Sequence, residues 1–315
     1  MATYSLAATD SDQSAPTAAS RVGARPRRRR ISFGRIFAWA ALGLIMLVTI
    51  FPFYWVLRTA LSTNAALPAG AGNLLPVGFT FENFARVLGA APAGAGDSTG
   101  TLNFWGFLRN SIITSTAITV GQVFFSAMAA YAFARLRWPG REQVFFIFLT
   151  ALMIPPVFVT LPNFVLMKDL GLLNTYVAMV LPYFFMTPFA IFFLRQFFLG
   201  ISREVEESAM LDGAGHARVF FQLVIPISRT PIITLGMLTY ITAWSDYFWP
   251  LLVGSDASVR PLTVALGVFQ AQTPQTGPDW AGLMAATLIA ALPMLLLFLI
   301  VGRQVVQNIG YSGIK

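Results

Sequence analysis

The chain has 315 residues, of which 56% are hydrophobic and 11% are charged, and its formal net charge is +8. Soluble globular domains carry about a quarter charged residues, so this composition predicts an integral membrane protein. The sequence has no cysteine and one histidine. These counts exclude disulfides, cysteine catalysis and multi-histidine metal sites, and we expect no metal site in this chain.

Residues 1–35 form an Arg-rich segment before the first long apolar run. The segment is rich in Ala, Ser and Thr and contains the basic run Arg25–Arg30, so it cannot bury enough apolar surface to fold. An arginine run can bind lipid or nucleic acid, but one that directly precedes an apolar stretch is typical of a topogenic flank. We predict a disordered cytoplasmic tail that binds no nucleic acid.

Six apolar runs approach or exceed the roughly 20 residues needed to cross a bilayer. They cover residues 36–57, 110–134, 144–166, 176–194, 230–253 and 280–301. The sequence therefore predicts an all-α integral membrane protein of six transmembrane helices. Its first helix is residues 36–57, its extracytoplasmic loop 58–108 and its core bundle 109–302.

The distribution of basic residues predicts the orientation of these helices. Most of the 21 Lys and Arg residues fall in the segments on one side of the predicted membrane, and that side is the cytoplasmic one. Both termini and the segment 202–229 are therefore predicted to be cytoplasmic. Arg135, Arg137 and Arg141 lie in a short loop on the same side, and we interpret them as topogenic.

Small residues and prolines distinguish individual runs. Ser126, Ala130 and Ala134 recur every four positions, which predicts a helix packed closely inside a bundle. Later runs contain internal prolines, which free backbone carbonyls that neighbouring helices or a wet cavity must satisfy. The prolines are compatible with a helix bundle that lines a transport pathway, and equally with kinked helices that only pack against one another.

Residues 202–229 are a polar segment between two apolar runs. Ser202 is predicted to cap a helix with acidic residues in its first turn, a favourable arrangement at the positive end of the helix dipole. Gly213 is predicted to end this helix in a left-handed conformation. A second short helix then covers about His216 to Val224 and ends at Pro226. One helical face carries small or polar side chains that a partner could approach: Val205, Ser208, Ala209 and Asp212. The same periodicity also suits an amphipathic segment on the membrane surface, and we expect His216 to be exposed and neither ligand nor base.

One pattern in this segment resembles the "EAA" loop of binding-protein-dependent ABC importer permeases. It consists of Glu207-Ser208-Ala209, then Gly213 after three further residues, and then Leu223–Pro226 after nine more. Ser208 stands where that family usually has Ala. Four further segments resemble its carbohydrate subfamily, above all the maltose-type permeases that lack a large periplasmic insertion. These segments are Ala129–Ala132, the helix break expected at Met153–Pro155, Gly171–Thr175 and Trp244–Leu251. The resemblance extends from about residue 36 to the C-terminus.

The resemblance implies a type I importer permease fold over residues 36–315, multi-pass in a bacterial cytoplasmic membrane, with a coupling helix within 202–229. The residues it implicates in coupling to an ATPase are Glu207, Ser208, Ala209, Asp212, Gly213, Phe220 and Pro226. The implied partners are a second related permease, two cytoplasmic ATPase subunits that bind ATP and Mg²⁺, and an extracytoplasmic solute-binding protein. The residues agree with this division, because neither lysine of the chain, Lys168 nor Lys315, lies in the Gly-Lys-Ser/Thr context of a P-loop. We expect a transport subunit without catalytic residues.

Asp246 is the acidic residue well inside a predicted span, where a charge costs about 2.5–3.5 kcal/mol and needs water or a partner. Its neighbours Trp244, Tyr247 and Trp249 suit a sugar, whose apolar face stacks on aromatic rings. These four residues are the candidate translocation path, although Asp246 could instead bond to a neighbouring helix. A di- or oligosaccharide is the expected solute, and glycerol phosphate, polyols and monosaccharides stay open. An ion-coupled secondary transporter with Asp246 as its proton site is the alternative function.

Overall fold

A computed structural model of the chain describes residues 33–70, 72–90, 103–271 and 279–309, and every regular element among them is helical. The chain divides into two units, residues 1–50 and 51–315. Helix α1, Phe33–Ala60, is 28 residues long and begins in the first unit. Most of the predicted N-terminal tail and the Gly/Ala-rich part of the loop at residues 91–102 lie outside the described residues.

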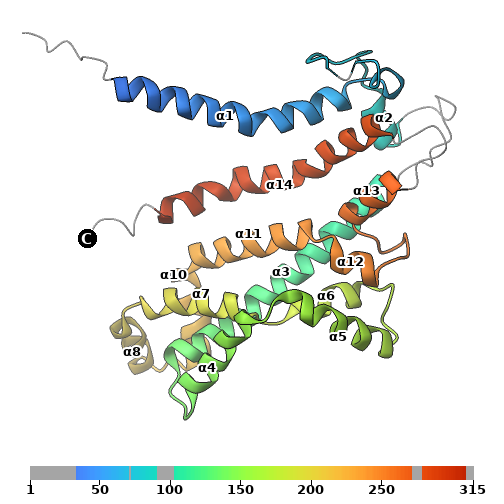
Figure 1. The fold of residues 1–315 in the computed structure, drawn as a ribbon. Helices are drawn as coiled ribbons and strands as arrows, with labels where there is room; N and C mark the ends of the chain where they lie inside the picture. Colours follow the sequence, from blue (N-terminus) through green and yellow to red (C-terminus); the bar gives the residue numbers. More distant parts are fainter. Residues whose placement is uncertain (1–32, 71, 91–102, 272–278, 310–315) are drawn as a thin grey trace, which may run out of the picture. The chain divides into compact units, whose positions relative to one another are not determined.

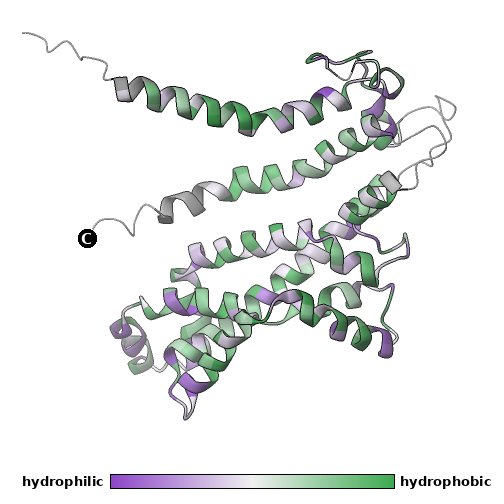
Figure 2. Cartoon of the chain, viewed as in Figure 1, coloured by the Kyte–Doolittle hydropathy of each residue, from purple (hydrophilic) through white to green (hydrophobic). Residues whose placement is uncertain are grey.

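Three helices are each long and apolar enough to cross a membrane (Figure 2). They are α1, α3 (Phe104–Arg135) and α14 (Trp280–Ile309). Three further pairs of helices pass the same criterion only when the two members are taken together across a bend. Within the described residues this gives three unbroken spans, and up to six if each bent pair is one span.

The first bent pair breaks where the sequence predicts it. Helix α4 (Arg141–Thr150) and a short 3-10 turn end at Met153, and α5 (Pro156–Asp169) leaves at 97° to them. Proline fits the first turn of α5, whose N–H groups have no intrahelical partner in any case. The break at Met153–Pro155 is confirmed.

The other two pairs bend less sharply. Helices α6 (Tyr176–Phe184) and α7 (Pro188–Leu199) meet at 44°, and the segment His216–Ile227 meets α11 (Arg229–Ser245) at 78°. The shorter elements complete the described chain: η1 (Asn64–Ala66), α2 (Glu82–Val87), α8 (Arg203–Leu211), α9 (His216–Val219), the π-helical turn η3 (Phe220–Val224), α10 (Ile225–Ile227), α12 (Phe248–Val253) and α13 (Leu262–Ala271).

Helix α3 is the central helix of the second unit and packs against α6, α7 and α11 (Figure 1). Ser126, Ala130 and Ala134 are each at most 1% exposed, so small side chains let neighbouring helices approach closely. The predicted position of this helix inside the bundle is confirmed.

The N-terminal end of α3 holds the segments around α12 and α13. The Asn110 amide donates hydrogen bonds to the carbonyls of Ser258 (2.9 Å) and Arg260 (3.0 Å), and the Tyr176 hydroxyl donates to the Asn110 carbonyl oxygen at 2.6 Å. The C-terminal end of the same helix lies against α8, as described below. One continuous helix therefore joins the two ends of the bundle.

Candidate functional site

The polar segment 202–229 folds as a compact knob of helix, glycine turn and helix, which we call the knob. Helix α8 begins after Ser202, whose extended backbone (φ −60°, ψ 131°) suits an N-cap, but its hydroxyl makes no capping hydrogen bond. Ser202 therefore occupies the N-cap position, but the predicted hydrogen bond from its side chain is wrong. Glu204 and Glu206 in the first turn still complement the helix dipole.

The end of α8 is a Schellman motif. Gly213 has φ +85°, as predicted for a left-handed glycine. Its N–H donates to the Met210 carbonyl at 3.0 Å, and the Ala214 N–H donates to the Ala209 carbonyl at 3.0 Å. These two bonds satisfy carbonyls at the helix end and fix the direction in which the chain leaves it.

The second helical segment of the knob does not stop at Pro226 as the sequence predicts, but continues to Ile227. The π-helical turn η3 directly precedes the proline, which has no N–H to donate to an α-helical hydrogen bond. The Ser228 N–H donates to the Val224 carbonyl at 2.9 Å, and the chain then bends into α11.

A buried ion pair fastens the knob to α3. Arg135 Nε lies 2.8 Å from Glu206 Oε1, and the two side chains are 5% and 7% exposed. The same guanidinium donates to the carbonyls of Phe198, in the last turn of α7, and Ile201, in the connection between α7 and α8. Burial raises the pKa of the Glu206 carboxyl and outweighs the Arg135 guanidinium, which lowers it. Arg135 is therefore a structural residue of the knob, and the interpretation that it serves topology alone is wrong.

Phe220 also anchors the knob from inside. Its side chain is 5% exposed, and its ring lies 5.2 Å from that of Tyr131 on α3. Val219 and Val224 on either side are fully buried in the same cluster. Of the predicted coupling residues, Phe220 thus packs against the bundle, whereas Ala209 is partly buried and five are exposed: Glu207, Ser208, Asp212, Gly213 and Pro226.

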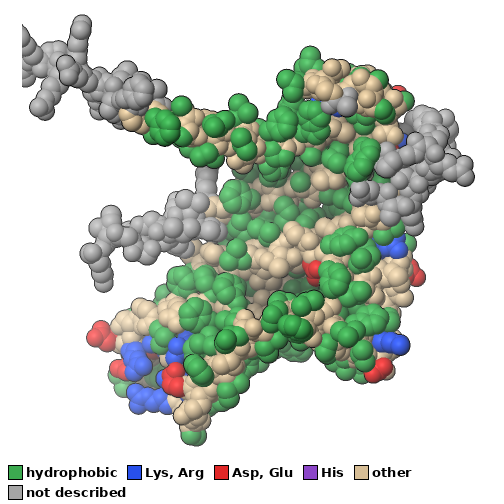
Figure 3. Space-filling model, in the orientation of Figure 1, with side chains coloured by type: hydrophobic (Ala, Val, Ile, Leu, Met, Phe, Trp, Pro, Cys, Tyr) green, Lys and Arg blue, Asp and Glu red, His purple; other side chains and the backbone are tan. Residues whose placement is uncertain are grey.

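The exposed face of the knob is mixed in character. Charged side chains gather at this end of the second unit (Figure 3), yet Leu211 is 89% exposed and Val205 is 42% exposed. Two exposed apolar side chains on a short polar helix form a surface suited to a protein partner.

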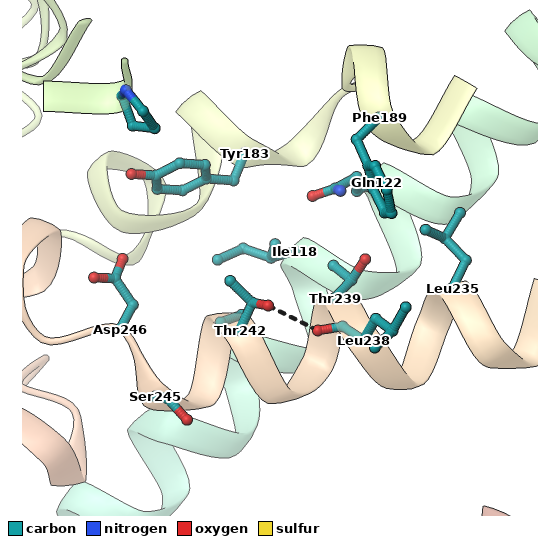
Figure 4. Close-up of a pocket in the computed structure, with 12 residues that line it drawn as sticks. Ile118, Gln122, Tyr183, Phe189, Leu235, Leu238, Thr239, Thr242, Ser245 and Asp246 are labelled. Carbon is teal, nitrogen blue, oxygen red and sulfur yellow. Dashed lines mark hydrogen bonds between the residues drawn. The ribbon is translucent and has the colours of Figure 1, made fainter. Parts of the chain in front are cut away.

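A half-open cavity of about 560 Å³ lies between α3, α6, α7 and α11, and Pro156 of α5 also lines it. Figure 4 shows the side chains that face it. Its polar lining consists of Gln122, Tyr183, Thr239, Thr242, Ser245 and Asp246, and Phe189 adds a second aromatic ring.

Asp246 lies at a helix break and not inside a helix, which corrects the sequence prediction. Helix α11 ends at Ser245, and Asp246 has extended backbone angles (φ −66°, ψ 126°). The Trp249 N–H donates to Asp246 Oδ1 at 3.4 Å, and the Thr263 hydroxyl donates to the Asp246 carbonyl at 2.9 Å. The side chain thus caps the first turn of α12 while it lines the cavity.

The aromatic neighbours of Asp246 do not line this cavity. Trp244 is 5% exposed and stacks on Tyr240, and Trp249 is 2% exposed and donates its indole N–H to the Ala178 carbonyl at 3.1 Å. Tyr247 is exposed, at 42%, but is also absent from the cavity lining. The cavity's rings come from Tyr183 and Phe189, which sequence reasoning missed.

Comparisons with known proteins agree with this fold. The family model for the inner membrane component of binding-protein-dependent transport systems matches residues 122–311. The diacetylchitobiose uptake system permease protein DasC of Streptomyces coelicolor is 28% identical, over 91% of this chain and 99% of its own length. The sn-glycerol-3-phosphate transport system permease protein UgpE of Yersinia pestis is 30% identical, over 87% of this chain and 95% of its own length.

A solved structure supports the same assignment. A chain from a bacterial ABC transporter involved in the import of the acidic polysaccharide alginate superposes with a TM-score of 0.75 at 25% identity, over 87% of this chain and 97% of that one. These relationships do not favour an ion-coupled secondary transporter. The chain belongs to the family of inner membrane components of binding-protein-dependent transport systems, and it is a multi-pass bacterial inner membrane protein, the permease subunit of an ABC importer whose ATPase is a separate subunit.

Proposed function

We propose that this chain is one of two related permease subunits of an importer that takes up a sugar, in the di- or oligosaccharide class, delivered by an extracytoplasmic binding protein. Two of the similar proteins described above carry carbohydrate names, one for diacetylchitobiose and one for alginate. The cavity supports the proposal physically, because it combines hydroxyl, amide and carboxylate groups with two aromatic rings. Such a lining suits a solute that has hydroxyl groups and an apolar ring face.

The proposal includes six membrane spans with both termini in the cytoplasm. Three unbroken helices and three bent pairs are compatible with six spans. The excess of Lys and Arg on one side supports the orientation.

Two ATPase subunits, which bind ATP and Mg²⁺, complete the proposed complex with the second permease and the binding protein. In this proposal the knob seats in a cleft of one ATPase subunit, and closure of the ATPase pair displaces it. The observation that carries the proposal is that α3 holds the knob through Arg135 and lines the cavity with Gln122. If the ATPase displaces the knob, α3 would therefore move with it and shift Gln122 in the cavity wall.

Co-purification tests this function directly. The chain, purified in mild detergent, is expected to bring with it an ATPase and a second permease, and the reconstituted complex is expected to import sugar only with ATP and the binding protein. A chain that purifies alone and transports solute on an ion gradient would overturn the proposal.

Leu211→Asp is expected to release the ATPase. The side chain is 89% exposed on the knob, and burial of a leucine in an interface contributes about 1.5–3 kcal/mol. Recovery of ATPase with the permease should therefore fall at least about tenfold. Leu170→Asp is the matched control, because Leu170 is 55% exposed outside the knob, in the turn after α5. Equal losses in both variants would contradict a docking role for the knob.

Asp246→Asn is expected to reduce sugar uptake without unfolding the bundle. Asparagine keeps an oxygen that can accept the Trp249 N–H, so the cap of α12 survives while the charge is lost. The measurements are initial uptake rates and thermal unfolding in detergent. Asp256→Asn is the control, since Asp256 accepts the Ser258 N–H in an exposed loop away from the cavity. Wild-type uptake in Asp246→Asn would remove Asp246 from the translocation path.

A further inference from the structure

We infer that the cavity selects solutes by charge: it takes a neutral or positively charged polyhydroxylated solute and disfavours an anionic one, such as a uronate or a phosphate ester. This inference rests on the proposed function, because it defines the class of sugar that the path admits. The inference concerns only the part of the path that this chain lines, whatever residues a partner permease adds.

The first observation is the charge inventory of the cavity. Asp246 is the one acidic residue among the 12 that line it, and none of the 12 is Lys, Arg or His. The four ion pairs found in the described residues all involve other carboxylates. No cationic side chain in this wall therefore compensates the negative charge of Asp246, which is stabilised only by backbone N–H groups at the start of α12. A carboxylate without a counter-ion attracts cationic and repels anionic ligands at short range.

The second observation is the balance of hydrogen-bond donors and acceptors. The Gln122 amide donates to the Thr187 hydroxyl at 3.1 Å, and the Thr242 hydroxyl donates to the Leu238 carbonyl at 2.9 Å (Figure 4). One N–H of Gln122 and the Thr242 hydroxyl proton are thus used within the protein, whereas the second Gln122 N–H and the hydroxyls of Tyr183, Thr239 and Ser245 can still donate. The charged group of the lining, the Asp246 carboxylate, only accepts. It can therefore bind the hydroxyl or ammonium donors of a solute, but not a carboxylate or phosphate, which brings only acceptors.

The third observation is the arrangement of these groups. Figure 4 shows the Asp246 carboxylate and the Tyr183 hydroxyl at one end of the cavity, with Gln122 and Phe189 toward the other end. The volume of about 560 Å³ lies within the range of roughly 300–1,000 Å³ for small-molecule sites. A sugar could therefore place a hydroxyl pair on Asp246 and stack a ring face on an aromatic side chain.

The absence of cysteine from the chain allows a direct test. Thr242→Cys places a single thiol in the cavity, one helical turn before Asp246. In the assembled complex in lipid nanodiscs, this thiol is reacted with a cationic (trimethylammonioethyl) and an anionic (sulfonatoethyl) methanethiosulfonate, and labelling of this chain is followed by mass. We expect the ratio of the cationic to the anionic rate to fall about tenfold when Asp246→Asn is added. An unchanged ratio would overturn the inference, and size-exclusion elution checks that both variants are folded.

Solute protection gives a second, independent result. Maltose, glucosamine and galacturonate are the neutral, cationic and anionic probes, and each is added at the same concentration before labelling with the cationic reagent. We expect maltose and glucosamine to slow labelling more than galacturonate, and we expect this difference to disappear in Asp246→Asn. Equal effects of the three probes on Thr242→Cys, including no effect of any, would overturn the inference.

Failure of the inference and failure of the proposed function give different results. The labelling experiments need neither ATP nor the binding protein, so they report on the cavity alone. Loss of charge selectivity with intact ATP-dependent uptake would refute only the inference. Absence of ATP-dependent uptake with intact charge selectivity would refute only the proposed function.

Discussion

Arg135→Ala is expected to destabilise the end of the bundle that carries the knob by about 3–5 kcal/mol, the range for removal of one partner from a buried ion pair. The change leaves the Glu206 carboxylate, 7% exposed, without its cation. It also removes the guanidinium that donates to the carbonyls of Phe198 and Ile201, so the connection into α8 loses its anchor as well.

Glu206→Ala is expected to be milder, because Arg135 keeps its two carbonyl partners when the carboxylate is removed. Glu204→Ala is the matched control, since Glu204 is an exposed glutamate in the same turn of α8 and should change stability by no more than about 0.5 kcal/mol. Thermal unfolding of the purified chain, measured in the same detergent throughout, ranks the three variants by stability. Equal shifts for Arg135→Ala and Glu204→Ala would contradict the role of the ion pair.

The sequence predicted several local features of this fold. The three unbroken apolar helices, the break at Met153–Pro155 and the left-handed Gly213 all follow from short-range chemistry: apolar length, proline geometry and the absence of a Cβ. The close packing of α3 was also predictable, because Ser126, Ala130 and Ala134 share one helical face.

The cavity could be predicted only in part, because its walls come from distant parts of the chain. Tyr183 and Asp246 line the same cavity although they are 63 positions apart in the sequence, and no local pattern pairs them. Thr239 and Thr242 were accessible to sequence reasoning, since their spacing from Asp246 puts them near one face of a helix that ends there. Trp244 and Trp249, which the sequence suggested for the path, are packed inside the bundle and are not among the residues that line this cavity.

Arg135 shows why a charge alone does not reveal its role. It belongs to a group of arginines that a topology rule explains equally well, and Arg137 and Arg141 lie within six residues of it. Its position distinguishes Arg135 from the other two arginines. It follows Tyr131 by four residues and so lies on the buried face of α3. A basic residue on a buried helical face needs a counter-ion, and Glu206 supplies it.

Gly213→Leu is expected to abolish sugar uptake while ATP hydrolysis by the assembled complex continues. An ideal Cβ at this position meets no atom within 4 Å, so the substitution causes no clash, and its cost comes from φ +85° alone. A left-handed conformation costs an L-residue about 1–2 kcal/mol. That cost is enough to disrupt the Schellman bonds and redirect the exposed face of α8, but the buried pair of Arg135 and Glu206 keeps the chain folded and inserted.

Gly215→Leu is the matched control for that result. Gly215 lies two residues further on, its Cβ position is equally open, but its backbone (φ −74°, ψ 165°) suits any residue. Gly213→Asn should be intermediate, because asparagine tolerates the left-handed conformation better than leucine. The measurement is sugar imported per ATP hydrolysed in proteoliposomes, which should fall in the order Gly215→Leu, Gly213→Asn, Gly213→Leu. If the two leucine variants import sugar equally well, the conformation of Gly213 does not shape the coupling surface, and the knob must act through its buried contacts to α3.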